Sequence, residues 1–143
     1  MKPGLHRPAL AVAALVLLGT GEAPAELVAV VSAKSPVTTL SRSQVADIFL
    51  GKASRFPDGG TAVPIDQVED AAARDEFYLR VAGKSPAQLN AHWSKIIFTG
   101  RGQPPREVAN GEAVKRLLIA NPAAIGYIDR SRVDASVRVV LDE

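Results

Sequence analysis

The sequence contains no cysteine, so the protein forms no disulfide and offers no thiolate to a zinc ion. Histidine is also scarce. Of the two, His6 lies in a segment that we expect to be removed, which leaves His92 as the only candidate base. Catalysis by a serine or cysteine nucleophile needs such a base and an orienting group. His92 lies mid-helix beside Trp93, where a partly exposed structural histidine is the simpler interpretation. We therefore predict no catalytic residue, no metal site and no enzyme activity.

The sequence also lacks an apolar run of the roughly 20 residues that a membrane span requires. Residues 9–19 are apolar, follow Lys2 and Arg7, and precede Ala-Pro-Ala at 23–25. A basic start, a short apolar region and a small-x-small site are the parts of a secretory signal peptide. We expect residues 1–25 to be a signal peptide cut after Ala25, and 26–143 to be one domain. No cysteine follows that would carry a lipid, so no membrane anchor is expected after cleavage. A transmembrane anchor and a buried N-terminal helix are the alternatives.

The sequence has no large excess of either basic or acidic residues. Residues 1–25 hold two of the 17 basic and one of the 15 acidic side chains, which leaves 15 and 14 in the expected mature chain. No basic run with interleaved aromatic residues is present, so the balance gives no support for a nucleic-acid partner.

Apolar periodicity and turn residues predict strands that alternate with helices, which is typical of an α/β domain. The unbroken apolar run at 27–31 fits a strand covered on both faces, as in a parallel sheet. Further strands are expected at 62–65, 124–128 and 137–141. Pro64 places the 62–65 strand at an edge, or itself at a strand end.

Four helices are predicted from caps and apolar spacing. Ser41 with Gln44 and Ser85 with Gln88 form capping boxes, and Asn110 caps a third start. A further helix is expected at about 70–82. The side chains expected to face inward are Val45, Ile48 and Phe49; Ala73, Phe77 and Val81; Leu89, Trp93, Ile96 and Ile97; and Val114, Leu117 and Leu118.

The loop that follows the third helix suggests a binding site. Thr99, Gly100, Arg101 and Gly102 offer a hydroxyl, backbone N–H groups without obstructing side chains, and a guanidinium. Such donors suit a tetrahedral oxyanion. A tight turn that exposes an arginine is the alternative interpretation.

Four motifs in fixed order carry a family resemblance: DIFLGK at 47–52, FPDG at 56–59, FTGRG at 98–102 with two prolines after it, and AIGY at 124–127. Together they resemble small, single-domain members of the phosphate ABC transporter substrate-binding protein family, a branch of the type 2 periplasmic binding proteins. The resemblance implies an α/β single-lobe domain with a central, mostly parallel sheet and about four helices. It also implies a periplasmic location, no cofactor, and weak binding of phosphate or a similar anion.

Ligands of open α/β sheets bind near strand ends, which adds Asp66 and Gln67 to the predicted ligand-binding set with Thr99, Gly100, Arg101 and Gly102. A membrane transporter or sensor is the partner that the resemblance implies. The full-length family members carry an Arg and a Ser-Gly-Thr run where this chain has residues 65–72. That divergence supports the alternative function, a periplasmic interaction or sensory module that retains the fold without tight ligand binding.

Overall fold

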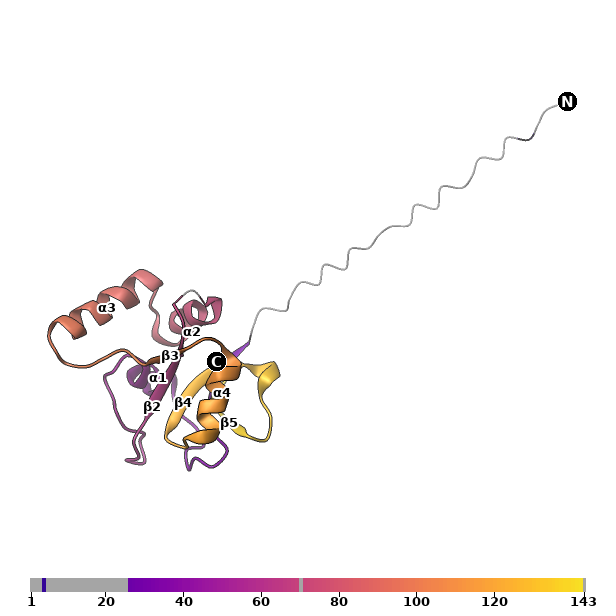
Figure 1. Cartoon of the computed structure of the whole chain (residues 1–143), viewed down its shortest axis with the longest axis horizontal. Coiled ribbons are helices and arrows are strands. Elements are labelled where there is room, and N and C mark those ends of the chain that lie inside the picture. Colours follow the sequence, from indigo (N-terminus) through magenta and orange to yellow (C-terminus); the bar gives the residue numbers. More distant parts are fainter. Residues whose placement is uncertain (1–3, 5–25, 70, 143) are drawn as a thin grey trace.

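The computed structural model describes residues 4, 26–69 and 71–142. The predicted signal peptide, apart from Gly4, lies outside the described residues and stays a prediction. Within the described residues a five-stranded mixed sheet has the strand order β3-β2-β4-β1-β5 and is flanked by four α-helices (Figure 1). The strands are β1 (Leu27–Ser32), β2 (Val63–Gln67), β3 (Arg106–Val108), β4 (Ala124–Asp129) and β5 (Val137–Leu141). The helices are α1 (Arg42–Phe49), α2 (Ala72–Ala82), α3 (Pro86–Phe98) and α4 (Gly111–Ala120), with a 3-10 turn η1 at Arg130–Arg132.

Four of these strands run in one direction, and β1 runs against them. β2 pairs in parallel with β3 and β4, whereas β1 pairs antiparallel with β4 and β5. The sheet is therefore mostly parallel, as expected. The run at 27–31 is buried on both faces, also as expected, but it forms the reversed strand. Its apolar pattern reports coverage by two layers, which does not depend on strand direction.

The two faces of the sheet carry separate cores. On one face Leu27, Ala29 and Val31 pack with the apolar sides of α1, α2 and α3. On the other face Val28 and Val30 pack against α4. Adjacent side chains of a strand point to opposite faces, so one continuous apolar strand supplies both cores.

The predicted helix starts are confirmed. Ser41 and Ser85 each accept a hydrogen bond from the backbone N–H three residues on, and the glutamine there completes the capping box. Asn110 caps α4 through Ala113 N–H. These bonds satisfy backbone donors that a helix leaves unpaired at its start. Residue 70, where the second helix was expected to begin, lies outside the described residues.

The expected position of the second strand in the sheet is refined. β2 lies between β3 and β4, so it is an interior strand, and Pro64 is tolerated because it lies at the strand's beginning. Pairing with β3 starts only at the next residue, Ile65. The strand Arg106–Val108 was not predicted, because three residues after two prolines carry little periodic signal.

Helix α3 projects away from the sheet, and a loop returns from its end to β3 (Figure 1). Leu89 and Trp93, in its first half, are buried in the core, and Ile96 is partly buried. Ile97 was expected to face inward, and this is wrong: it is 56% exposed, and its neighbour Phe98 is 92% exposed. The helix continues past the layer that it covers, and among the described residues nothing buries the side of its last turn that carries Ile97 and Phe98.

Candidate functional site

The loop at 99–102 is the C-terminal turn of α3. The backbone N–H groups of Thr99, Gly100 and Arg101 donate to the carbonyls of Lys95, Ile97 and Ile96, each at 3.1 Å. Gly100 has a φ of +68°, a left-handed conformation that glycine adopts without strain. The Thr99 hydroxyl lies 3.0 Å from the Lys95 carbonyl and 3.1 Å from the Ile96 carbonyl. Of the neutral donors expected to hold an oxyanion, the Thr99 hydroxyl and the Gly100 N–H are therefore engaged by the helix, as is the backbone N–H of Arg101, whose guanidinium remains as a donor.

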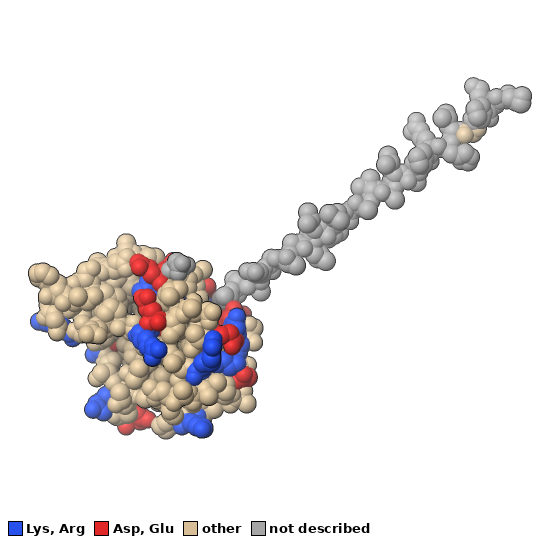
Figure 2. All heavy atoms as spheres, viewed as in Figure 1, with Lys and Arg blue, Asp and Glu red and all other residues tan. Residues whose placement is uncertain are grey.

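That guanidinium lies at a pocket of about 660 Å³ whose lining residues come from two segments, the end of α1 and α3 with its C-terminal turn. Lys52 follows α1, Lys95 lies on α3, and Arg101 follows α3. The remaining lining residues are Gly51, His92, Ile96 and Thr99. In the described part of the chain no acidic residue lines this pocket, and all three cationic residues are exposed. Basic side chains gather along the lower edge of the projecting part of the molecule in Figure 2.

The pocket carries uncompensated positive charge. Lys52, Lys95 and Arg101 form no salt bridge with any other residue that the structure describes. Like charges around one hollow raise its potential and attract anions. The Nε2 of His92 lies 2.8 Å from the Leu50 carbonyl, which only accepts, so Nε2 carries a proton. The role of His92 at this pocket is thus partly structural, because the bond ties α3 to the end of α1.

Asp66 and Gln67, at the end of β2, belong to a buried polar network. Asp66 is 1% and Gln67 5% exposed. The Asp66 carboxylate receives the hydroxyls of Tyr78 and Tyr127 at 2.6 and 2.5 Å, the Gln67 backbone N–H at 2.8 Å, and the Arg74 Nε at 3.4 Å. The two donors at each oxygen use the carboxylate's roughly four acceptor positions.

The same network holds a buried charge pair. Arg74 is 5% exposed and pairs with Asp66, while Glu107 lies 3.9 Å from its other side. Burial lowers the pKa of the Arg74 guanidinium, but the charge of Asp66, the hydrogen bond to it and the neighbouring Tyr78 and Glu107 together more than offset this, so that pKa lies above its usual value. Burial, and then the adjacent Asp66 charge, raise the pKa values of Tyr78 and Tyr127 far above that of a free tyrosine.

The six predicted ligand residues therefore fall in three places. Thr99 and Arg101 line the cationic pocket, and Gly100 and Gly102 line a neighbouring hollow with Ile97. Asp66 and Gln67 lie in the buried network.

Sequence reasoning did not assign Lys52, His92 or Lys95 to a site. For His92 and Lys95 the sequence did contain a signal. Residues 92, 95, 96 and 99 are spaced three and four apart, so they share one face of α3. Lys52 belongs to another segment, and no spacing in the sequence indicated that it lines the same pocket.

The described residues contain no group of three or more histidine, cysteine, aspartate or glutamate side chains placed to hold a metal ion. Nor does any helix among them have the length and apolar content needed to span a membrane.

No protein-family model and no curated protein matches the chain. Solved structures do. A phosphate ABC transporter substrate-binding protein from Clostridium perfringens, with phosphate bound, matches with a TM-score of 0.65 and 24% identity over 81% of this chain and 44% of its own. An ABC-type phosphate transport receptor from Vibrio cholerae matches with a TM-score of 0.64 and 21% identity, over 81% of this chain and 46% of its own.

PstS from Borrelia burgdorferi gives a TM-score of 0.58 and 14% identity, over 82% of this chain and 47% of its own. The chain thus spans less than half the length of each of these structures. The resemblance found in the sequence is confirmed as a likeness of fold: this chain has the α/β fold of part of a phosphate ABC transporter substrate-binding protein.

Proposed function

We propose that this protein is a periplasmic binding module for phosphate or a related oxyanion, linked to ABC-type uptake or its sensing, and not an enzyme. One observation carries the proposal: Lys52, Lys95 and Arg101 line one pocket and have no ion-pair partner among the described residues. The fold that the chain shares with the phosphate-binding structures supports the same ligand class.

The cationic side chains carry the proposed binding. Arg101 offers a planar fork of donors that fits two oxygens of an oxyanion, and the lysines add flexible point charges. Asp66 accepts four hydrogen bonds within the protein, so a proton donated by hydrogen phosphate would first have to displace one of them. We therefore assign Asp66 and Gln67 a structural role in the buried network at the end of β2, and not a contact with the anion.

Calorimetric titration with phosphate, sulfate and arsenate tests the proposal. We expect weak binding, because the pocket is open and solvated. The Kd should be about 1 mM or higher, and 1 mM corresponds to a binding free energy of roughly −4 kcal/mol. Arg101→Ala should abolish the heat signal. Lys34→Ala is the matched control, because Lys34 is an exposed cation that does not line the pocket. No heat with any of the three anions at high millimolar concentration would refute the proposal.

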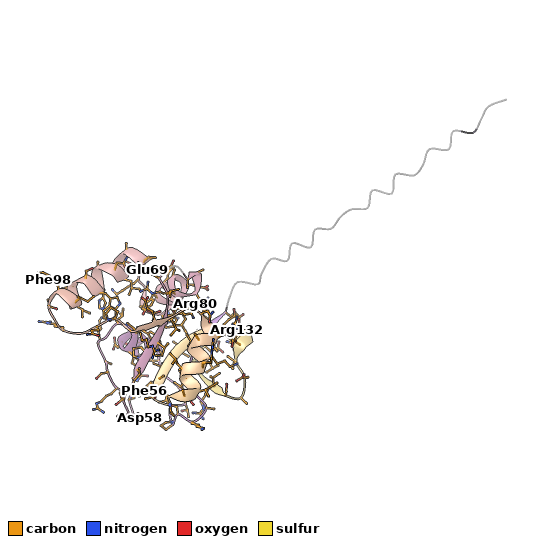
Figure 3. The ribbon with its side chains drawn as sticks, viewed as in Figure 1. Phe56, Asp58, Glu69, Arg80, Phe98 and Arg132 are labelled. Atoms are coloured by element: carbon orange, nitrogen blue, oxygen red, sulfur yellow. The ribbon has the colours of Figure 1, made fainter. Side chains whose placement is uncertain are left out.

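A second candidate is the interaction module, and a specific feature favours it. Phe98 is 92% exposed at the tip of the projecting α3, where Figure 3 shows it at the outer end of the helix. Ile97 beside it is 56% exposed, and the cationic Lys95 and Arg101 flank the pair. Exposed aromatic side chains of this kind are common anchors of protein interfaces. The partner that fits has an apolar pocket bordered by acidic residues.

A photoreactive amino acid placed at position 98 tests this candidate in intact cells. A specific crosslinked partner is expected from position 98 and not from position 119, where the apolar Ile119 is 49% exposed on α4. Equal crosslinking from both positions, or none from position 98, would contradict a docking role for the tip.

A further inference from the structure

The cationic pocket is much larger than one phosphate ion. Its volume is about 660 Å³. A phosphate ion has four oxygens, and if each is given the volume of a liquid water, ~30 Å³, the ion occupies roughly 120 Å³. A single orthophosphate would therefore leave most of the pocket to water and would not contact all of its sides at once.

The donors that remain at the pocket are suited to a long ligand. Lys52 reaches it from the end of α1, and Lys95 and Arg101 reach it from α3 and its C-terminal turn, all on long, flexible side chains. The backbone N–H groups of Thr99, Gly100 and Arg101, which could form part of a tight cage around one tetrahedral anion, donate within the end of α3, and the single proton of the Thr99 hydroxyl is directed at the same helix. The charge of the pocket is thus carried by three separate flexible side chains and not by a rigid cage of backbone donors.

Solvent exposure makes the charge of the ligand decisive. A pair of opposite charges in water gains only about a quarter of the energy that the same pair gains at a partly screened surface site. In an open pocket each contact is worth little, so affinity depends on how many contacts form together. A ligand with several linked anionic groups satisfies the three cations simultaneously, whereas a compact anion satisfies them in part.

We propose that this pocket takes a chain of two or more linked phosphate groups, as in pyrophosphate, tripolyphosphate or the phosphates of a nucleotide, in preference to orthophosphate. The inference rests on the proposed function, because it assigns the anion to the same pocket. It adds the ligand's length: the chain would lie across the hollow, with Arg101 at one rim and the lysines at the others.

Competitive and direct calorimetry on the purified protein tests the proposal. Orthophosphate, pyrophosphate, tripolyphosphate, ATP and citrate are titrated in buffer free of divalent cations. We expect tripolyphosphate to bind at least about tenfold more tightly than orthophosphate, with pyrophosphate in between. Added salt should weaken tripolyphosphate binding more than orthophosphate binding, because more charge pairs are screened. Binding of ATP equal to that of tripolyphosphate would identify the phosphate chain alone as the recognised part, and tighter binding of ATP would identify a nucleotide as its source.

Variants locate the site and separate the outcomes. Lys52→Ala, Lys95→Ala and Arg101→Ala should each reduce tripolyphosphate affinity several-fold and leave the thermal unfolding temperature unchanged, while Lys34→Ala should change neither. Orthophosphate binding that equals or exceeds tripolyphosphate binding would overturn this inference and leave the proposed function intact. Citrate binding as tight as that of pyrophosphate would also overturn it, because the pocket would then recognise charge alone. If no phosphate species binds, the proposed function fails as well.

Discussion

Raising the pH should destabilise this protein through its two buried tyrosines. Tyr78 and Tyr127 are the only tyrosines in the sequence, and they are 1% and 0% exposed. Both hydroxyls donate to Asp66, and Phe77 stacks on the Tyr127 ring with the centroids 4.0 Å apart. Ionising either tyrosine would place a second negative charge beside a buried carboxylate. Burial and Asp66 therefore raise the pKa of both hydroxyls in the folded protein.

The sign of the pH effect follows from this shift. A tyrosine in the unfolded chain has a pKa of about 10, so below that pH both states keep their protons and stability is at its full value. Above about pH 10 the unfolded chain releases protons that the folded protein retains, and stability falls as pH rises. Each tyrosine lowers the free energy of unfolding by about 1.4 kcal/mol at pH 11, so the pair accounts for roughly 3 kcal/mol. Total stabilities of small domains are about 5–15 kcal/mol, so this loss is large.

Tyrosinate absorbance, followed together with circular dichroism and urea denaturation, provides the assay. We expect no tyrosinate signal while the protein stays folded, and a signal from both tyrosines when alkaline unfolding occurs. Lysines also titrate in this range, so the matched variant is Tyr78→Phe. It should lose about 1.5–3 kcal/mol at neutral pH, through the lost hydrogen bond to a charged acceptor, but retain only about half of the tyrosine-dependent decline above about pH 10.

A tyrosinate transition near pH 10 with unchanged circular dichroism would refute this reasoning, because it would show that the hydroxyls ionise without unfolding. A decline of stability with pH that is the same in Tyr78→Phe and in the unmodified protein would refute the part assigned to Tyr78.

Three further substitutions test the packing. Gly126→Ala should cost about 1–3 kcal/mol in urea denaturation, because a Cβ there would overlap with Val114 Cγ1; adding Val114→Ala should recover part of this loss, and strictly additive costs would contradict the clash. Ser85→Ala should lower the free energy of unfolding by about 0.5–2 kcal/mol through loss of the bond to the Gln88 backbone N–H, and an unchanged thermal midpoint would argue against that cap. Phe98→Ser should change stability by no more than about 0.5 kcal/mol, since the ring is 92% exposed; a loss of several kcal/mol would show that the ring is buried.

Local signals predicted the elements well, because they depend on residues close in sequence. The capping boxes at Ser41 and Ser85 need only a side chain and a backbone group three residues away. The same locality explains the failure at Ile97. Its spacing matches the apolar face of α3, but burial depends on whether another element covers that turn, and none of the described elements does.

The candidate site was less predictable, because its parts come from distant segments. Arg101 was predicted to contact an anion together with its glycine neighbours, yet one of them, Gly100, serves to end α3. Lys52 lies 49 residues before Arg101 in the sequence. It reaches the same pocket only because α3 packs through Trp93 onto the core beside α1. No periodicity links two segments of this kind.

By itself the sequence determined the α/β class, the helix starts and the lack of thiol chemistry, since each depends on composition or on near neighbours in the chain. Only the tertiary structure decided the fate of the charged residues. It buried Asp66 and Arg74 together with both tyrosines, and it left Lys52, Lys95 and Arg101 around one open pocket without a partner among the described residues. The physical reason is that a charge acts according to its solvent exposure and its neighbours in space, which are set when the helices pack on the sheet.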